Sequence, residues 1–177
     1  WNGTVPETNA GGDRVIIKAP IIKHIGTNVT WLGLHFTSVQ STNRTIAPGG
    51  TNNWYVSPAI DLPQPGLGNS VINCVIYNVG HPAIGWWDQG DGSEISGCIF
   101  WGNGFYDWNG ASWTRGTSIY AQNGVGSVLV KNCISFRNFT EGMQAYATEA
   151  FVSGFTFREN ITMMNPIGYG VAVWSAN

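Results

Sequence analysis

The sequence is poor in charge, in helix-forming residues and in long apolar runs. Only 10% of its 177 residues are charged, and its eight Lys and Arg are scattered through a chain of net charge −2. This composition argues against a surface for nucleic acid or anionic lipid. No apolar run approaches about 18 residues, so we expect no membrane insertion. Helix formers are scarce beside 24 Gly and many Asn, Thr and Ser, which argues against a helical protein.

Hydrophobic residues and tryptophan are abundant instead. The chain is 43% hydrophobic and contains nine Trp, which is too apolar for a disordered segment. Its length is that of one ordinary domain. It begins at Trp1 without a charged and apolar leader region. We therefore expect one domain over residues 1–177 that is a piece of a longer chain.

A short apolar segment recurs along the chain and predicts a repeat architecture. In each copy we expect the second and fourth residues to be buried and the third to face solvent. Three residues before each later copy comes another apolar residue: Val71, Ile95, Val130 and Phe157. The copies are Gly33-Leu34-His35-Phe36, Cys74-Val75-Ile76-Tyr77, Cys98-Ile99-Phe100-Trp101, Cys133-Ile134-Ser135-Phe136 and Asn160-Ile161-Thr162-Met163.

A further apolar segment follows each copy and completes the repeat. Its inward residues are predicted to be Ile60 and Leu62, Ile84 and Trp86, Ile119 and Ala121, Met143 and Ala145, and Val171 and Val173. Units of about 24 residues, with insertions only between strands, are typical of stacked coils rather than hairpins. We predict an all-β, right-handed parallel β-helix of about five coils, with three short strands per coil. An incomplete earlier turn is expected at 14–18 and 21–22.

The chain resembles the pectate-lyase-like superfamily of parallel β-helix proteins, and within it secreted bacterial β-helix proteins that mostly lack an assigned activity. The resemblance covers about residues 15–174 and rests on Asn-rich turns and two segments. Relatives often carry His near the positions of Thr117 and Gln144, which this chain does not. The two segments are Arg115-Gly116-Thr117-Ser118-Ile119-Tyr120-Ala121-Gln122-Asn123 and Gly142-Met143-Gln144-Ala145-Tyr146.

The cysteines and histidines have structural interpretations. Cys74, Cys98 and Cys133 occupy one column of the repeat, in the place held by Gly33 in the first copy and Asn160 in the last. We expect three buried free thiols stacked in a tight bend; a disulfide or a thiol metal site is the alternative. The three histidines, at positions 24, 35 and 81, are too scattered for a zinc site and are expected in loops or on the surface.

The outward residues of the last strand in each coil predict a sugar-binding surface. Aromatic faces stack on the C–H face of a sugar ring, and amides bind its hydroxyls. The alternative is that a loop or another domain covers these aromatic residues. The residues expected to bind a glycan are Trp87, Tyr120, Gln122, Gln144 and Tyr146, with Trp108 and Trp113 from an insertion.

Two insertions, at 39–57 and 102–117, are long enough to be functional. The second contains Tyr106, Asp107, Trp108, Trp113 and Arg115, and we expect it to fold beside Trp87 and Tyr120 as one wall of a groove.

Catalysis has only partial support. Asp88, Asp107 and Arg115 are the weak candidates for a polysaccharide lyase or glycoside hydrolase site. Asp88 and Asp91 lie in a Gly-rich segment with oxygens that suit Ca²⁺, although an ordinary turn explains it equally. No complete catalytic set is visible, and no cofactor is required.

Three functions stay open. The first is an extracellular or cell-surface module that recognises a polysaccharide, and the second is a lyase or hydrolase. The third is a structural solenoid of a surface filament or appendage. For partners, we expect a glycan, and the rest of a longer chain or a neighbouring subunit at the open solenoid ends. Five N-x-Ser/Thr sites would matter only in a eukaryotic secreted protein: Asn2, Asn28, Asn43, Asn138 and Asn160.

Overall fold

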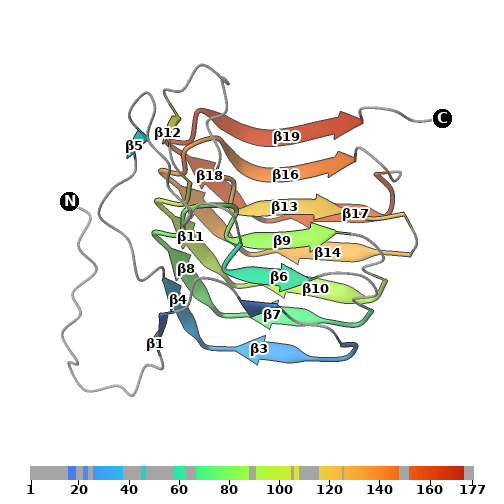
Figure 1. Ribbon diagram of the computed structural model, residues 1–177. Helices are drawn as coiled ribbons and strands as arrows, with labels where there is room; N and C mark the ends of the chain where they lie inside the picture. The colour runs from blue at the N-terminus through green and yellow to red at the C-terminus, as the bar shows by residue number, and fades with distance from the viewer. Residues whose placement is uncertain are drawn as a thin grey trace.

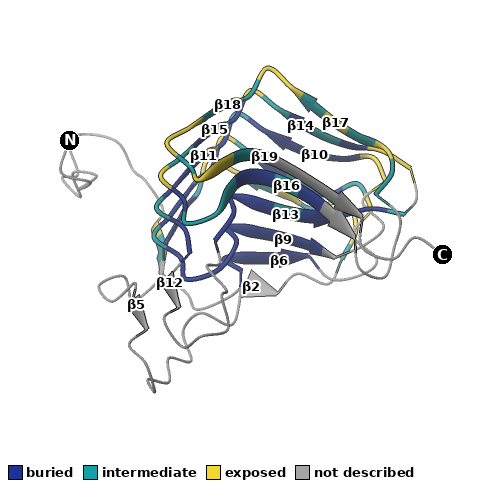
Figure 2. Ribbon diagram, turned by 90° about the horizontal axis from the view of Figure 1, so that it is seen from above, coloured by how far each residue is buried: buried dark blue, intermediate teal, exposed yellow. Residues whose placement is uncertain are grey.

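The structure is a computed structural model in which three parallel β-sheets enclose one interior (Figures 1 and 2). Two sheets have six strands and one has five. A two-stranded parallel sheet pairs β5 (Thr45–Ile46) with β12 (Tyr106–Asp107). The described residues are 16–18, 22–23, 26–37, 45–46, 58–62, 67–87, 91–104, 106–107, 116–124, 126–147 and 152–173.

Each large sheet is built from strands that lie one coil apart. Sheet A contains β1 (Ile16–Lys18), β4 (His35–Thr37), β8 (Val75–Tyr77), β11 (Ile99–Trp101), β15 (Ile134–Phe136) and β18 (Ile161–Met163). Sheet B contains β2 (Ile22–Lys23), β6 (Ile60–Leu62), β9 (Ile84–Trp87), β13 (Ile119–Gln122), β16 (Glu141–Ala147) and β19 (Ile167–Val173). Sheet C contains β3 (Thr30–Leu32), β7 (Ser70–Ile72), β10 (Ser93–Ser96), β14 (Val128–Lys131) and β17 (Phe155–Arg158).

The chain runs through sheets C, A and B in turn, so that each coil has three strands. Five complete coils follow one another: β3-β4-β6, β7-β8-β9, β10-β11-β13, β14-β15-β16 and β17-β18-β19. β1 and β2 form the incomplete turn before them. Figure 1 shows the coils stacked from β3 to β19. The predicted parallel β-helix with three strands per coil is confirmed.

The corners between strands explain why Asn and Gly are frequent. The corner from sheet C to sheet A turns at one residue with φ between 53° and 68°, at positions 33, 73, 97, 132 and 159. The corner from sheet A to sheet B turns in the same way at positions 78, 102, 137 and 164. Gly and Asn enter this left-handed region at the lowest cost, and they occupy six of these nine positions.

Stacked apolar columns fill the interior. Ile84, Ile119 and Met143 are neighbours in register and completely buried, as predicted. The predicted sheet C column of Val71, Ile95, Val130 and Phe157 is also in register. In Figure 2 the strands of the inner coils are mostly buried, whereas β17 and β18 in the last coil are more exposed.

The predicted facing of the sheet A strands is wrong. The third residue of each repeat segment points inward, because Ile76, Phe100 and Ser135 are completely buried. The second residue points outward, since Ile99 is 36% exposed and Ile161 is 52% exposed. Both faces of these strands are apolar over several coils, so hydrophobicity alone could not distinguish the two faces. The first and third residues of these segments therefore face the interior, and the first is the cysteine in three of the coils.

Two register predictions at the ends of the solenoid are also wrong. His35 pairs with Val75, so Leu34 and not Gly33 occupies the cysteine column in the first coil. In the last coil Met143 pairs with Tyr169 and Ala145 with Val171, a shift of two residues from the predicted alignment. A shift of two residues keeps each side chain on the same face of the sheet, so the hydrophobic pattern did not detect it.

Candidate functional site

Adjacent strands of sheet B carry most of the predicted glycan-binding residues. Tyr120 on β13 lies beside Gln144 on β16, and Gln122 lies beside Trp87 on β9. Tyr146 lies on β16, opposite Ala172. The parallel register of three consecutive coils therefore brings these residues to one sheet.

Burial differs along this face. Tyr120 and Gln144 are half-buried, whereas Gln122 is only 8% exposed. The side chains of Trp87 and Tyr146 lie outside the described part of the structure. Tyr120 and Gln144 are therefore the two predicted contacts with demonstrated access to solvent.

A carboxylate lies in the same outward column as Tyr120. Asp61 on β6 pairs with Gly85 on β9, and Gly85 pairs with Tyr120. Asp61 is buried, with 8% exposure. One position without a side chain therefore separates a carboxylate from an aromatic ring along the solenoid axis.

The two predicted insertions leave the solenoid at the same corner and pair with each other. Both connect sheet A to sheet B, and β5 of the first pairs with β12 of the second (Figure 1). Gly104 and Gly116 close the base of the second insertion, because a Cβ on Gly116 would overlap the backbone of Gly104. The Gly104 amide donates to the Val79 carbonyl at 2.7 Å.

Few of the weaker candidates fall within the described residues. Asp107 lies on β12, where its backbone pairs with Ile46. Asp88, Trp108, Trp113 and Arg115 lie outside the described residues. Of the three proposed catalytic groups, only Asp107 therefore lies within the described residues.

Asp91 has a structural contact. Its Oδ1 accepts a hydrogen bond from the Ser127 amide of the next coil at 3.0 Å. Within the described ranges, no group of three or more His, Cys, Asp or Glu could hold a metal ion. The Asp91 carboxylate thus stabilises a corner between coils.

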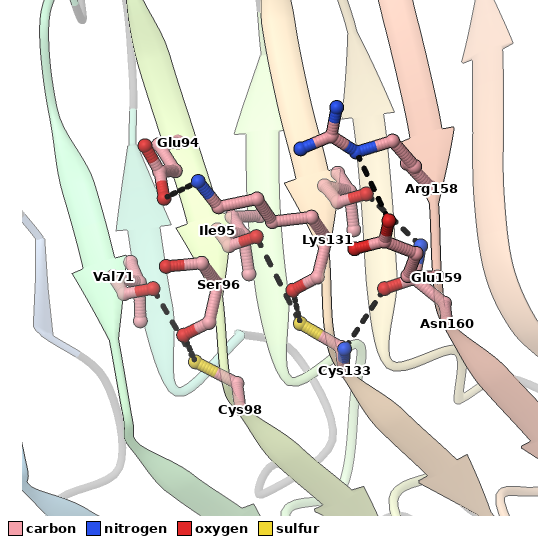
Figure 3. A network of polar contacts seen from close by, with 11 residues as sticks. Val71, Glu94, Ile95, Ser96, Cys98, Lys131, Cys133, Arg158, Glu159 and Asn160 are labelled. Atoms are coloured by element: carbon pink, nitrogen blue, oxygen red, sulfur yellow. Dashed lines mark hydrogen bonds and ion pairs between the residues drawn. The ribbon is translucent and has the colours of Figure 1, made fainter.

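The three cysteines are free and buried, as predicted, and Figure 3 shows two of them, Cys98 and Cys133. Each thiol donates to a carbonyl of the preceding coil: Cys98 to Val71 at 3.3 Å and Cys133 to Ile95 at 3.8 Å. In the last coil Asn160 continues the column, and its Nδ2 donates to Val130 at 2.9 Å. The thiols therefore act as small hydrogen-bond donors at a corner.

The pKa values of neighbouring thiols in this column are shifted in opposite directions. Hydrogen bonds to Cys133 and Cys74, together with burial, raise the pKa of Cys98 far above its ordinary value. The hydrogen bond from Cys98 lowers the pKa of Cys74 to about 7. The middle thiol thus keeps its proton, which stays available for the hydrogen bond to the Val71 carbonyl.

Beside this column, Figure 3 shows a polar surface on sheet C. Lys131 Nζ lies 3.1 Å from Glu94 Oε1. A hydrogen bond from Ser96 and the ion pair with Lys131 lower the pKa of Glu94. Arg158 Nε lies 3.8 Å from Glu159 Oε1, so both cations drawn here have acidic partners.

A buried asparagine ladder at the corner from sheet A to sheet B was missed in the sequence. Asn138 Oδ1 accepts from the Asn103 amide at 3.1 Å, and Asn165 Oδ1 accepts from the Asn138 amide at 2.9 Å. Asn138 Nδ2 also lies 3.0 Å from both Ser118 Oγ and Ser135 Oγ. The signal was present, because each Asn stands two residues after a sheet A strand.

Two histidines are buried; His35 contradicts the prediction because it lies in a strand, whereas His81 lies in a loop as predicted. His35 lies on β4 and His81 lies at the corner between β8 and β9, and each is 9% exposed. The stacking of the coils buries His35 and His81, and their local sequence does not indicate this. His24 lies outside the described residues.

Comparison with known proteins adds no assignment. Among the described residues there is no helix with the length and apolarity that a membrane crossing requires. The chain matches no family model, no curated protein and no solved structure.

Proposed function

We propose that this chain is a carbohydrate-binding β-helix module, acting outside the cell or on its surface, that holds a polysaccharide against the outer face of sheet B. The observation that carries the proposal is the register that places Tyr120 beside Gln144 and Gln122 beside Trp87. An aromatic ring beside an amide matches a sugar, which has an apolar C–H face and hydroxyl edges.

The charge of this face favours a neutral glycan. β9, β13 and β16 contain no Lys or Arg, and the same outward column carries Asp61. These three strands therefore offer no cation to a uronate polymer, and Lys23, which pairs with Asp61, lies on β2 at the other end of the sheet. The resemblance to pectate-lyase-like proteins also supports a polysaccharide ligand, because lyases with this fold act on polysaccharides.

The test combines a glycan array with calorimetric titration of the neutral oligosaccharides that bind. The double variant Tyr120→Ala, Gln144→Ala should weaken binding by about tenfold or more, because it removes a stacking ring and a hydrogen-bonding amide. The matched control, Leu129→Ala with Thr156→Ala, changes neighbouring outward residues on sheet C and should bind as the parent does.

A second variant distinguishes a binding face from a covered face. Trp87→Ala should abolish glycan retention with little change in melting temperature. If the parent binds no glycan and this variant loses about 3–5 kcal/mol of stability, Trp87 is a packing residue and the proposal is wrong. Release of unsaturated uronate by the parent would instead show a lyase.

A further inference from the structure

The outer face of sheet A is apolar over consecutive coils. Its first outward column runs Val75, Ile99, Ile134 and Ile161, and the second contains Tyr77, Trp101, Phe136 and Met163. Ile99 is 36%, Met163 45% and Ile161 52% exposed. We call the accessible part the sheet A strip: Val75, Ile99, Ile134, Ile161, Phe136 and Met163. Contiguous apolar surface of this kind marks an interaction site.

Stacked aromatic rings make the strip rigid. The Tyr77 and Trp101 centroids lie 5.2 Å apart with planes inclined by 6°, and those of Trp101 and Phe136 lie 6.3 Å apart at 13°. Trp101 is stacked between the other two rings and is only 8% exposed. The rings thus support a firm apolar platform.

Polar residues border the strip on both sides. Asn73, Asn132 and Glu159 are exposed at the corner that precedes it, and Arg137 is exposed at the corner that follows it. Within the described side chains of β8, β11, β15 and β18 there is no charged residue. Along the direction of the strands, the strip is therefore an apolar surface with polar residues on both sides.

The size of the strip excludes two kinds of protein partner. Three strand spacings give a length of about 14 Å, and two outward columns lie about 7 Å apart. A stable dimer buries about 800 Å² on each partner, far more than this strip offers. β8, β11 and β15 are paired on both edges, so no peptide can add as a strand beside them; the open edge of β18 lies at the end of the strip and not on its face. A narrow linear ligand fits better than a second copy.

We propose that the sheet A strip binds the apolar ring face of a flat, neutral polysaccharide, at a surface separate from sheet B. Sugar rings lie on the aliphatic column, and their hydroxyl edges reach the amide and charged side chains of the two borders. A lipid acyl chain has no hydroxyl groups that could bind the polar side chains of the two borders. This inference rests on the proposed function for the class of ligand, a neutral polysaccharide, but not for the surface that binds it.

The probes are insoluble cellulose and insoluble chitin, used in depletion isotherms with the full chain. Ile99→Ser with Ile134→Ser should raise the half-saturation concentration by about tenfold or more, because apolar contact area is lost. The matched control, Ile72→Ser with Leu129→Ser, changes half-buried outward residues of sheet C and should bind as the parent does. Both pairs face outward, so both should fold.

Several outcomes would overturn the inference. These are no binding of the parent to either polymer, equal losses in both variant pairs, or binding to neutral phosphatidylcholine vesicles that depends on Ile99 and Ile134. A dimer in light scattering that dissociates on Ile99→Ser with Ile134→Ser would favour a second copy. If the parent binds no soluble oligosaccharide but binds the polymers in a way that depends on Ile99 and Ile134, this inference is supported and the proposed function is wrong.

Discussion

Two corners of the solenoid perform the same task with different side chains. At the corner from sheet C to sheet A, thiols of Cys74, Cys98 and Cys133 donate to carbonyls of the preceding coil. At the corner from sheet A to sheet B, Asn103 and Asn165 donate to the equivalent carbonyls of Ile76 and Ser135. In these coils the inward corner position therefore carries a compact hydrogen-bond donor.

The two corners differ in whether the side chain also accepts a hydrogen bond from the backbone. Each ladder amide also accepts a backbone N–H through Oδ1, as Asn138 does from Asn103 at 3.1 Å. A thiol is a weak donor and a weak acceptor. An asparagine therefore satisfies a backbone donor and a backbone acceptor, whereas a cysteine chiefly fills space and satisfies one carbonyl.

The largest expected effect is at the centre of the asparagine ladder. Asn138→Ala removes the acceptor of the Asn103 amide and the donor to Ser118 and Ser135, all buried. We expect a loss of about 4 kcal/mol in the free energy of unfolding, measured in urea. The control Asn160→Ala, at the half-buried end of the cysteine column, should lose about 2 kcal/mol. Equal losses would contradict the difference between the corners.

The substitution Asn103→Cys places at the corner from sheet A to sheet B the type of side chain found at the corner from sheet C to sheet A. The new thiol can still donate to Ile76, but the Val79 amide loses the acceptor that it has at 3.2 Å. We expect a loss of about 2 kcal/mol by the same urea measurement, because a buried donor is left unsatisfied. A variant as stable as the parent would show that a thiol replaces the amide fully.

The smallest effect is a pH dependence from the cysteine column. The raised pKa of Cys98 means that its contribution to stability is complete below the unfolded thiol value of 9.0 and is lost as the pH rises above it. The loss should be about 1.4 kcal/mol per pH unit for one proton. Cys98→Ala should remove this part of the decline in urea unfolding between about pH 9 and 10.5. An unchanged slope would show that Cys98 ionises normally in the folded protein.

The sequence predicted which residues face inward correctly for sheet B and wrongly for sheet A. Tyr120, Gln122 and Gln144 alternate with small or apolar inward residues, so the period of two places them on the outer face. On sheet A both alternating sets are apolar, and the sequence could not show which one faces solvent. The burial of His35 and His81 depends on neighbouring coils, which no local pattern reveals.

The sequence alone determined the repeat, the three strands per coil, the apolar interior of sheets B and C and the column of free thiols. Each of these follows from residue types that recur at fixed positions in every coil. Only the tertiary structure decided the register of the end coils, the outward face of sheet A, the asparagine ladder and the pairing of β5 with β12. These features depend on which residues of different coils meet, and parallel stacking fixes that only when the whole solenoid is assembled.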